Sequence, residues 1–108
     1  MTFQISAALL DACVLAILKG GDEYGYALTQ KVNEVVVLSE STLYPVLRRL
    51  QRESYLTTYD SQFNGRNRRY YKLSDSGREK LCIYIEEWEA YKNNLDKILL
   101  GGMKSGQE

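Results

Sequence analysis

Residues 39–73, SESTLYPVLRRLQRESYLTTYDSQFNGRNRRYYKL, decide the fold of this 108-residue chain. Leucine and valine recur at helical spacing through residues 43–50, which predicts an amphipathic helix beginning after Ser39 as its N-cap. Residues 56–60 and 68–73 are rich in threonine and tyrosine, and they flank a polar connection that contains Asn64 and Gly65. This pattern predicts two β-strands joined by a tight turn.

Basic residues are concentrated in the same stretch. The whole chain has 14 basic and 14 acidic residues, yet the segment from Tyr44 to Lys72 has seven basic and two acidic ones, a net charge of +5. A helix followed by a basic hairpin is typical of a winged helix-turn-helix, in which the helix enters the major groove of DNA and the wing follows the backbone. A segregated positive face can neutralise phosphates even in a neutral protein. We therefore predict DNA binding; the alternative is an ordinary solvated charged surface.

The composition argues against an enzyme and against a bound metal or other cofactor. The chain has no histidine, which excludes histidine metal sites, histidine general bases and Ser-His or Cys-His nucleophile pairs. It has no phosphate-binding loop and no paired carboxylates in an apolar setting. Cys13 and Cys82 form no CxxC pattern and lie in apolar helical segments, so we expect both to be buried in a protein of a reducing compartment.

Two helices are expected before the central stretch. The first covers residues 6–19; it is apolar on most sides, and such a helix needs cover on more than one face, from its own domain and from a partner. Asp11 and Lys19 interrupt its apolar run, which is too short to span a bilayer, so we expect a cytoplasmic protein. The second helix should run from Tyr24 or Gly25 to Val36, with Asp22 as its N-cap.

A long helix is expected at the C-terminal end, from Ser74 as N-cap to Leu100. Its length, roughly 40 Å, exceeds the width of a small domain, so it must project. Apolar side chains recur along it at alternating steps of three and four, which is typical of a seam between helices. These residues are Leu81, Tyr84, Trp88, Tyr91, Leu95 and Ile98. Since no partner of that length exists within the chain, we predict a homodimer.

The predicted fold class is mainly α with a small β-hairpin. Residues 1–73 should form the winged helix-turn-helix domain, including the N-terminal helix. Residues 74–102 should form the dimerisation helix, and residues 103–108 a disordered tail.

Candidate DNA contacts lie at the start of the second helix, along the third helix and in the wing. The set is Tyr24, Ser41, Thr42, Tyr44, Arg48, Arg49, Gly65, Arg66 and Arg68. Hydroxyls near a helix N-terminus meet the groove first, and wing arginines can pair with phosphate or enter the minor groove. Only one side of the third helix can face DNA, so Arg48 and Arg49 need not both contact it. Packing is an alternative for Tyr44 and for Tyr24.

Trp88 is the only tryptophan and lies midway along the last helix. Near a twofold axis it would face its symmetry mate, and the two indoles could line a flat pocket for an aromatic cation. Glu89 or Asp11 could balance the charge of such a ligand. The alternative is a tryptophan that only fills the dimer core.

Three runs resemble the PadR family of bacterial transcriptional regulators: YGYALTQKV at 24–32, STLYPVLRRLQRESYL at 41–56 and GRNRRYYKLSDSGREKL at 65–81. The resemblance extends from about residue 9 to residue 88. It implies a winged helix-turn-helix repressor, and the twofold symmetry of the predicted homodimer implies a pseudo-palindromic operator. The single short C-terminal helix is similar to the compact subfamily that includes a lactococcal multidrug-sensing repressor. Ser54 stands where the family commonly has glycine, so that turn is expected to differ slightly.

The resemblance also implies a drug pocket between subunits, in which a tryptophan stacks on planar ligands. Trp88 occupies the matching place. The residues carried over to its side of the helix are Leu81, Ile85 and Lys92, and those carried over to the opposite wall are Ala8, Asp11, Ala12 and Leu15. The predicted function is thus a homodimeric repressor released by a planar aromatic or cationic molecule. The alternative is a winged-helix module that binds protein and not specific DNA.

Overall fold

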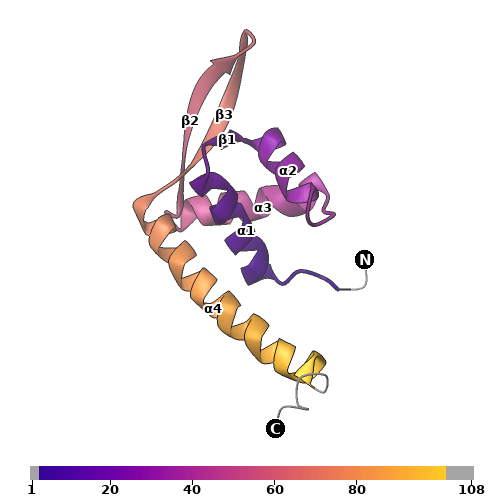
Figure 1. The fold of residues 1–108 in the computed structure, drawn as a ribbon. Coiled ribbons are helices and arrows are strands. Elements are labelled where there is room, and N and C mark those ends of the chain that lie inside the picture. Colours follow the sequence, from indigo (N-terminus) through magenta and orange to yellow (C-terminus); the bar gives the residue numbers. More distant parts are fainter. Residues whose placement is uncertain (1–2, 102–108) are drawn as a thin grey trace.

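The computed structural model describes residues 3–101, apart from the side chain of Glu40. The tail expected at residues 103–108 lies outside the described residues. Within them, four helices and a three-stranded antiparallel sheet confirm the expected fold class (Figure 1). The elements are α1 (Ala7–Lys19), β1 (Glu23–Tyr24), α2 (Gly25–Asn33), α3 (Glu40–Arg52), β2 (Leu56–Phe63), β3 (Arg66–Leu73) and α4 (Asp75–Leu99).

The β2–β3 hairpin, called the wing below, is longer than the sequence pattern predicted. Its strands pair without interruption from Leu56 opposite Leu73 to Phe63 opposite Arg66. Asn64 and Gly65 both have positive φ values, of 53° and 76°, as a two-residue type I′ turn requires. The polar residues next to the turn were expected to form a loop, but backbone pairing needs no apolar side chain, so the strands continue to the tip.

A short strand before α2 was not expected. β1 pairs with β3 through Glu23 opposite Tyr71, which gives the strand order β1-β3-β2. Two residues are too few to produce a periodic signal. Because β1 takes up Tyr24, α2 begins at Gly25, and it ends at Asn33 and not at Val36. The prediction that Asp22 caps this helix was wrong: its carboxylate instead accepts a hydrogen bond from Tyr59.

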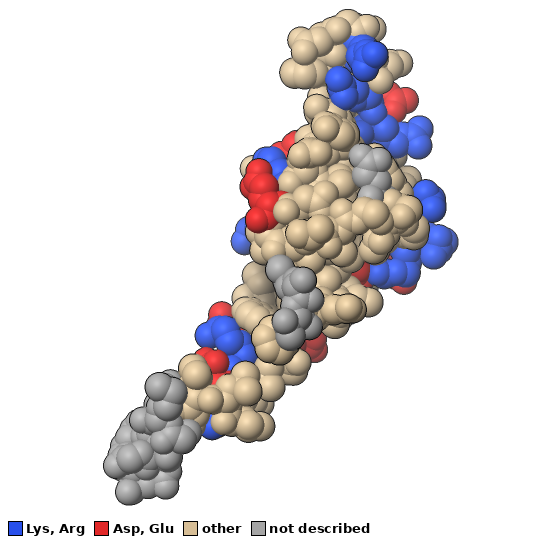
Figure 2. Space-filling model, turned by 90° about the vertical axis from the view of Figure 1, so that its right-hand side faces the viewer, with Lys and Arg blue, Asp and Glu red and all other residues tan. Residues whose placement is uncertain are grey.

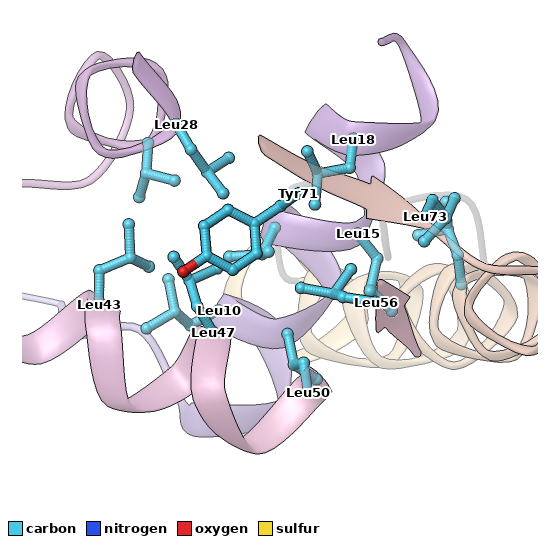
Figure 3. Close-up of a cluster of buried hydrophobic side chains, with 13 residues drawn as sticks. Leu10, Leu15, Leu18, Leu28, Leu43, Leu47, Leu50, Leu56, Tyr71 and Leu73 are labelled. Atoms are coloured by element: carbon cyan, nitrogen blue, oxygen red, sulfur yellow. The ribbon is translucent and has the colours of Figure 1, made fainter. Parts of the chain in front are cut away.

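The core lies where α1, α2 and α3 meet the base of the sheet. Tyr71 of β3 is surrounded by leucines from the three helices (Figure 3). The buried apolar residues are Leu10, Val14, Leu15, Leu18, Leu28, Val32, Leu43, Leu47, Leu50, Leu56, Tyr71, Leu73 and Leu81. Tyr70 points to the other side of the strand and is half-buried, as alternation along a strand requires. Among the described residues, no helix is both long enough and apolar enough to cross a membrane.

The junction between α3 and the wing is a tight turn. Tyr55 N–H donates to the Leu50 carbonyl and Ser54 N–H donates to the Gln51 carbonyl, which is the Schellman pattern of hydrogen bonds at a helix end. This pattern places Ser54 in the left-handed region, with φ of 69°. The turn therefore keeps the geometry that favours glycine although it has serine. The hydroxyls of Ser74 and Ser76 both donate to the Ser54 carbonyl, at 2.7 and 2.8 Å.

α4 begins at this same junction and then leaves the body (Figure 1). Ser74 accepts a hydrogen bond from Gly77 N–H, which confirms it as the N-cap. α1 packs along α4, but much of α4 is exposed, and the molecule measures 62 × 29 × 21 Å. The expectation that both cysteines are buried was wrong, because Cys82 lies on the exposed side of α4 and Cys13 is only half-buried.

Candidate nucleic-acid interface

α3 presents one polar face to solvent. Its apolar side chains Leu43, Leu47 and Leu50 are fully buried, which fixes the rotation of the helix. The exposed side chains on the opposite side follow each other at steps of four, three and four, which places them on one stripe. They are Ser41, Pro45, Arg48 and Arg52. Neither arginine makes an ion pair with another described side chain.

Hydroxyl groups gather at the N-terminus of α3. The Ser39 hydroxyl lies 2.9 Å from that of Ser41 and 3.0 Å from that of Thr42. Ser39 occupies the N-cap position but makes no capping hydrogen bond from its side chain. Ser41 and Thr42 are exposed. Donors at a helix N-terminus suit a phosphate, because the free backbone N–H groups and the helix dipole favour negative charge there.

Tyr44 packs against the start of α2. A Cβ atom built on Gly25 would lie 2.9 Å from both Cε1 and the hydroxyl oxygen of Tyr44, so glycine lets the ring lie directly against the backbone of α2. Tyr44 is half-buried and packs against the core. The ring thus packs α2 against α3, as the alternative to DNA contact had it. Part of the side chain remains accessible.

Arg49 does not lie on the exposed face of α3. It was expected among the DNA contacts, but its guanidinium turns toward α1 and pairs with Asp11, at 2.6 Å between Nη2 and Oδ1. It also lies 3.3 Å from Glu53. The hydrogen bond to Asp11 is the main cause that raises the pKa of Arg49. Arg48 and Arg49 thus have different surroundings, because adjacent residues on a helix point about 100° apart.

The wing arginines also divide into two kinds. Arg66 is exposed beside Gly65 at the tip. Arg68 folds back over β1, with its guanidinium carbon 4.3 Å from the centre of the Tyr24 ring and 5.6 Å from that of Phe63. Its Nε is buried and has no hydrogen-bond partner among the described atoms. Arg68 and Tyr24, both expected to contact DNA, therefore stack on each other.

Aromatic rings brace the base of the wing. Tyr24 meets Tyr70 edge-on at 5.6 Å between centroids, and Tyr70 stacks on Tyr59 at 5.5 Å. The Tyr59 hydroxyl donates to Asp22 at 2.7 Å, which is the main cause that raises the pKa of Tyr59. Tyr59, Phe63 and Asp22 were not among the expected site residues. The register of β1 was the missing information, because it brings these side chains together.

The positive charge follows one side of the molecule. Figure 2 shows Lys and Arg side chains along the right-hand edge of the view, from the wing down the side of the body, with few acidic side chains among them. One wing charge is offset locally, because Arg69 lies 3.5 Å from Asp60, but both side chains are about 60% exposed and water weakens the pair.

A hollow of about 400 Å³ lies between α1 and α4 and is called the α1–α4 hollow below. It is lined by Ser6, Ala8, Leu9, Ala12, Tyr84, Glu87, Trp88 and Tyr91. Of the expected pocket residues, the structure brings together Ala8, Ala12 and Trp88. Glu87 was not among the expected pocket residues, and its place next to Trp88 gave no signal because adjacent residues on a helix point about 100° apart.

The other expected pocket residues lie elsewhere. Leu15 and Leu81 are buried in the core of their own chain, which also removes Leu81 from the expected dimer seam. Asp11 is turned toward Arg49. Ile85 is exposed and does not line the hollow, and Lys92 lies 4.0 Å from Glu89. On α4, packing against α1 turns Leu81 inward and leaves Ile85 exposed.

Known proteins share this architecture. A family model described as the transcriptional regulator PadR-like family matches residues 14–82. A crystal structure from Streptococcus mutans UA159 is 40% identical, covers 94% of this chain and 95% of its own, and gives a TM-score of 0.89. A PadR family transcription regulator from Clostridium difficile R20291 is 32% identical over 83% of this chain and 97% of its own, with a TM-score of 0.78.

A third similar structure includes DNA. Bacillus subtilis PadR in complex with operator DNA is 26% identical, covers 70% of this chain and 47% of its own, and gives a TM-score of 0.62. The neighbours that carry a functional name are transcriptional regulators and not enzymes. The family model covers more than half of the chain and includes α2, α3 and the whole wing. The chain therefore belongs to the PadR-like family of transcriptional regulators.

Proposed function

We propose that the chain is a cytoplasmic, homodimeric, sequence-specific DNA-binding regulator of the repressor type. In each subunit α3 enters a major groove and the wing lies on the neighbouring backbone. The observation that carries the proposal is the common exposure of the α3 stripe and the wing tip, with Arg48, Arg52 and Arg66 all solvent-exposed. The likeness to a regulator bound to its operator supports the same use of these two elements.

Each group on this surface has a distinct task. Ser41 and Thr42, at the helix start, suit a phosphate or a base edge. Arg48 and Arg52 lie on the same stripe and suit phosphate or guanine, while Arg66 and the Gly65 backbone suit the phosphates beside the wing. Tyr24, Arg68 and Arg49 support the surface from behind, because each is already engaged with another side chain.

The homodimer rests on the apolar surface of α4. Trp88, Tyr91 and Ile98 are 38%, 59% and 78% exposed, and Leu99 is 71% exposed. A row of large exposed apolar side chains on a projecting helix marks an interface. A second copy of the same helix has its apolar residues at the same spacing and can pack against this row. Twofold symmetry then predicts a pseudo-palindromic operator whose half-sites lie about one helical turn of DNA apart, or a multiple of that.

Selection from random duplexes tests the proposal. The dimer should enrich a single inverted repeat, and Arg48→Gln together with Arg66→Gln should abolish the enrichment while the protein stays folded. Recovery of unrelated sequences by the unaltered protein would refute sequence-specific binding. It would favour the alternative, a winged-helix module for protein partners, whose DNA affinity would not depend on these arginines.

We also propose that a planar aromatic cation binds in the α1–α4 hollow and releases the operator. Trp88 and Tyr91 offer ring faces, 6.3 Å apart between centroids, and Glu87 supplies a negative charge in the same lining. Rhodamine 6G should quench Trp88 fluorescence and weaken operator binding over the same concentration range, and Glu87→Gln should reduce both effects. Quenching with unchanged operator affinity would refute release.

A further inference from the structure

Asp11 is a carboxylate in the middle of an apolar helix. It is only 5% exposed, and its neighbours on the same face of α1 are core residues such as Val14 and Leu15. Burying a charged carboxylate costs free energy unless partners compensate it. The identity of those partners therefore indicates what the residue does.

The two oxygens of Asp11 reach two different helices. Oδ1 accepts a hydrogen bond from Arg49 of α3 at 2.6 Å, and Oδ2 accepts one from the Tyr84 hydroxyl of α4 at 3.5 Å. The second contact is long and therefore weak. Burial raises the pKa of Tyr84, and the Asp11 charge raises it further, so the tyrosine remains a donor. One carboxylate thus connects α1, α3 and α4.

Backbone packing links α1 closely to α4 and less closely to α3, although side chains of all three helices share the core. α4 packs chiefly on α1, whereas α3 packs chiefly on β2 and α2. α4 carries the proposed dimer seam, and α3 carries the proposed reading stripe. Tyr84 also lines the α1–α4 hollow. The contacts of Asp11 therefore lie on the route between the part that sets the subunit arrangement and the part that meets DNA.

We propose that Asp11 is a positioning residue that locks α3 to the α1–α4 pair, keeps Arg49 off the DNA, and so fixes the distance between the two reading helices of the dimer. Occupation of the hollow changes that distance through Tyr84. The proposal rests on the dimeric DNA-binding function proposed above. It adds that half-site spacing is set inside each subunit, by the Asp11–Arg49 pair.

The test compares two duplexes, the selected operator and the same operator with one base pair inserted between its half-sites. The insertion moves the half-sites by about 3.4 Å and turns them by about 35°. The unaltered dimer should bind the longer duplex at least about tenfold more weakly, and Asp11→Asn should reduce this difference to about threefold or less. A purely structural role would lower the affinity for both duplexes equally and leave their ratio unchanged, and this result would overturn the proposal.

Arg49 provides an independent measurement. The slope of log affinity against log salt falls by about 0.9 for each lost phosphate contact. Arg49→Gln should leave the slope unchanged, while the neighbouring control Arg48→Gln should reduce it by that amount. An equal reduction for Arg49→Gln would place Arg49 on the DNA and overturn the proposal.

A double variant guards against misfolding. Arg49→Gln leaves the buried Asp11 charge without its cationic partner, and Asp11→Asn leaves Arg49 only the more exposed Glu53. Asp11→Asn with Arg49→Gln instead replaces the pair by two neutral amides. The double variant should melt higher than either single variant and should show the same relaxed spacing preference. Failure of the unaltered protein to select any operator would refute the DNA-binding function itself, and with it the spacing role. If the unaltered protein selects an operator, but Asp11→Asn and the double variant keep its ratio of affinities for the two duplexes, only the role of Asp11 is refuted.

Discussion

The wing and α4 both project from the body, but their surfaces differ in kind. The wing is polar and basic at its tip, and its two strands pair with each other along their whole length. α4 presents Trp88, Tyr91 and Ile98 to solvent. A polar hairpin can remain exposed to water as it stands. An exposed apolar helix face is unfavourable in a single chain, because its contact with water costs free energy that burial would remove.

The two surfaces therefore correspond to two requirements for operator binding, namely attraction of DNA and association of two subunits. Under the proposed function, the wing determines how strongly one subunit attracts DNA, and α4 determines whether two subunits act together. The junction of α3, β2 and α4 at Tyr55, Ser74 and Gly77 joins the two projections. Substitutions in each region should therefore change different observables.

The largest effect is expected from a charge in the apolar face of α4. Ile98→Glu should convert the dimer to monomer, because a carboxylate would be buried in the seam. Operator affinity should then fall by about a hundredfold or more, since two linked reading heads bind far more tightly than one. Sedimentation and operator titration measure both changes.

Lys97→Gln, one position away, is the matched control and should remain dimeric. The isolated Ile98→Glu chain should keep its melting transition, because Ile98 makes no part of the core. A variant that stays dimeric and binds normally would remove α4 from the interface.

Gly77→Ala should destabilise the junction although alanine favours helices. An added Cβ would collide with the Tyr55 carbonyl oxygen and with Leu73, so we expect a loss of about 1–3 kcal/mol in the free energy of unfolding. Gly101→Ala is the control, since its Cβ would meet no atom within 4 Å. Urea unfolding measures both, and a stabilised Gly77→Ala protein would show that the close approach is not required.

Substitutions of two wing arginines should separate an effect on DNA binding from an effect on stability. Arg66→Gln should reduce the slope of log affinity against log salt by about 0.9, because it removes one phosphate contact. Arg68→Gln should leave this slope nearly unchanged and instead cost about 0.5–1 kcal/mol of stability through the lost stacking on Tyr24. The same salt titration with both variants checks the pair; equal slopes would mean that the two arginines share one role.

Ser54→Gly should stabilise the protein slightly. Ser54 has a positive φ of 69°, which costs a residue with a Cβ about 1 kcal/mol relative to glycine. The carbonyl that Ser74 and Ser76 contact belongs to the backbone and remains in the variant. A lower midpoint in urea would indicate that the serine hydroxyl has a role of its own.

The smallest effect is a dependence of stability on alkaline pH. Tyr84 has a raised pKa in the folded protein, mainly through burial, so the unfolded chain loses this proton first as the pH rises above 10. The contribution is complete below pH 10 and is lost as the pH passes through the folded pKa. Tyr84→Phe should therefore flatten the decline in unfolding free energy between pH 9 and 11, which unfolding at a series of pH values measures. Tyr59→Phe, in the exposed wing, should change this decline less. A larger change for Tyr59→Phe than for Tyr84→Phe would contradict burial as the main cause of the raised pKa of Tyr84.

The architecture could be predicted because its signals are local. Leu43, Leu47 and Leu50 repeat at helical spacing, and Asn64 with Gly65 specifies the turn. The site was harder, because side-chain roles depend on contacts between distant residues. Arg48 and Arg49 are adjacent and chemically identical, and only the packing of α1 on the domain decides which one meets Asp11. In the same way, the two-residue pairing of β1 decides that Arg68 stacks on Tyr24.

The most direct test of the central claim is a salt titration of binding to the selected operator and to a scrambled duplex. We expect a linear fall of log affinity with log salt, with a slope of about −5 to −9 for six to ten phosphate contacts made by the dimer. We also expect the operator to bind at least about a thousandfold more tightly than the scrambled duplex. Equal, weak binding to both duplexes with a shallow slope would contradict sequence-specific recognition by a dimer.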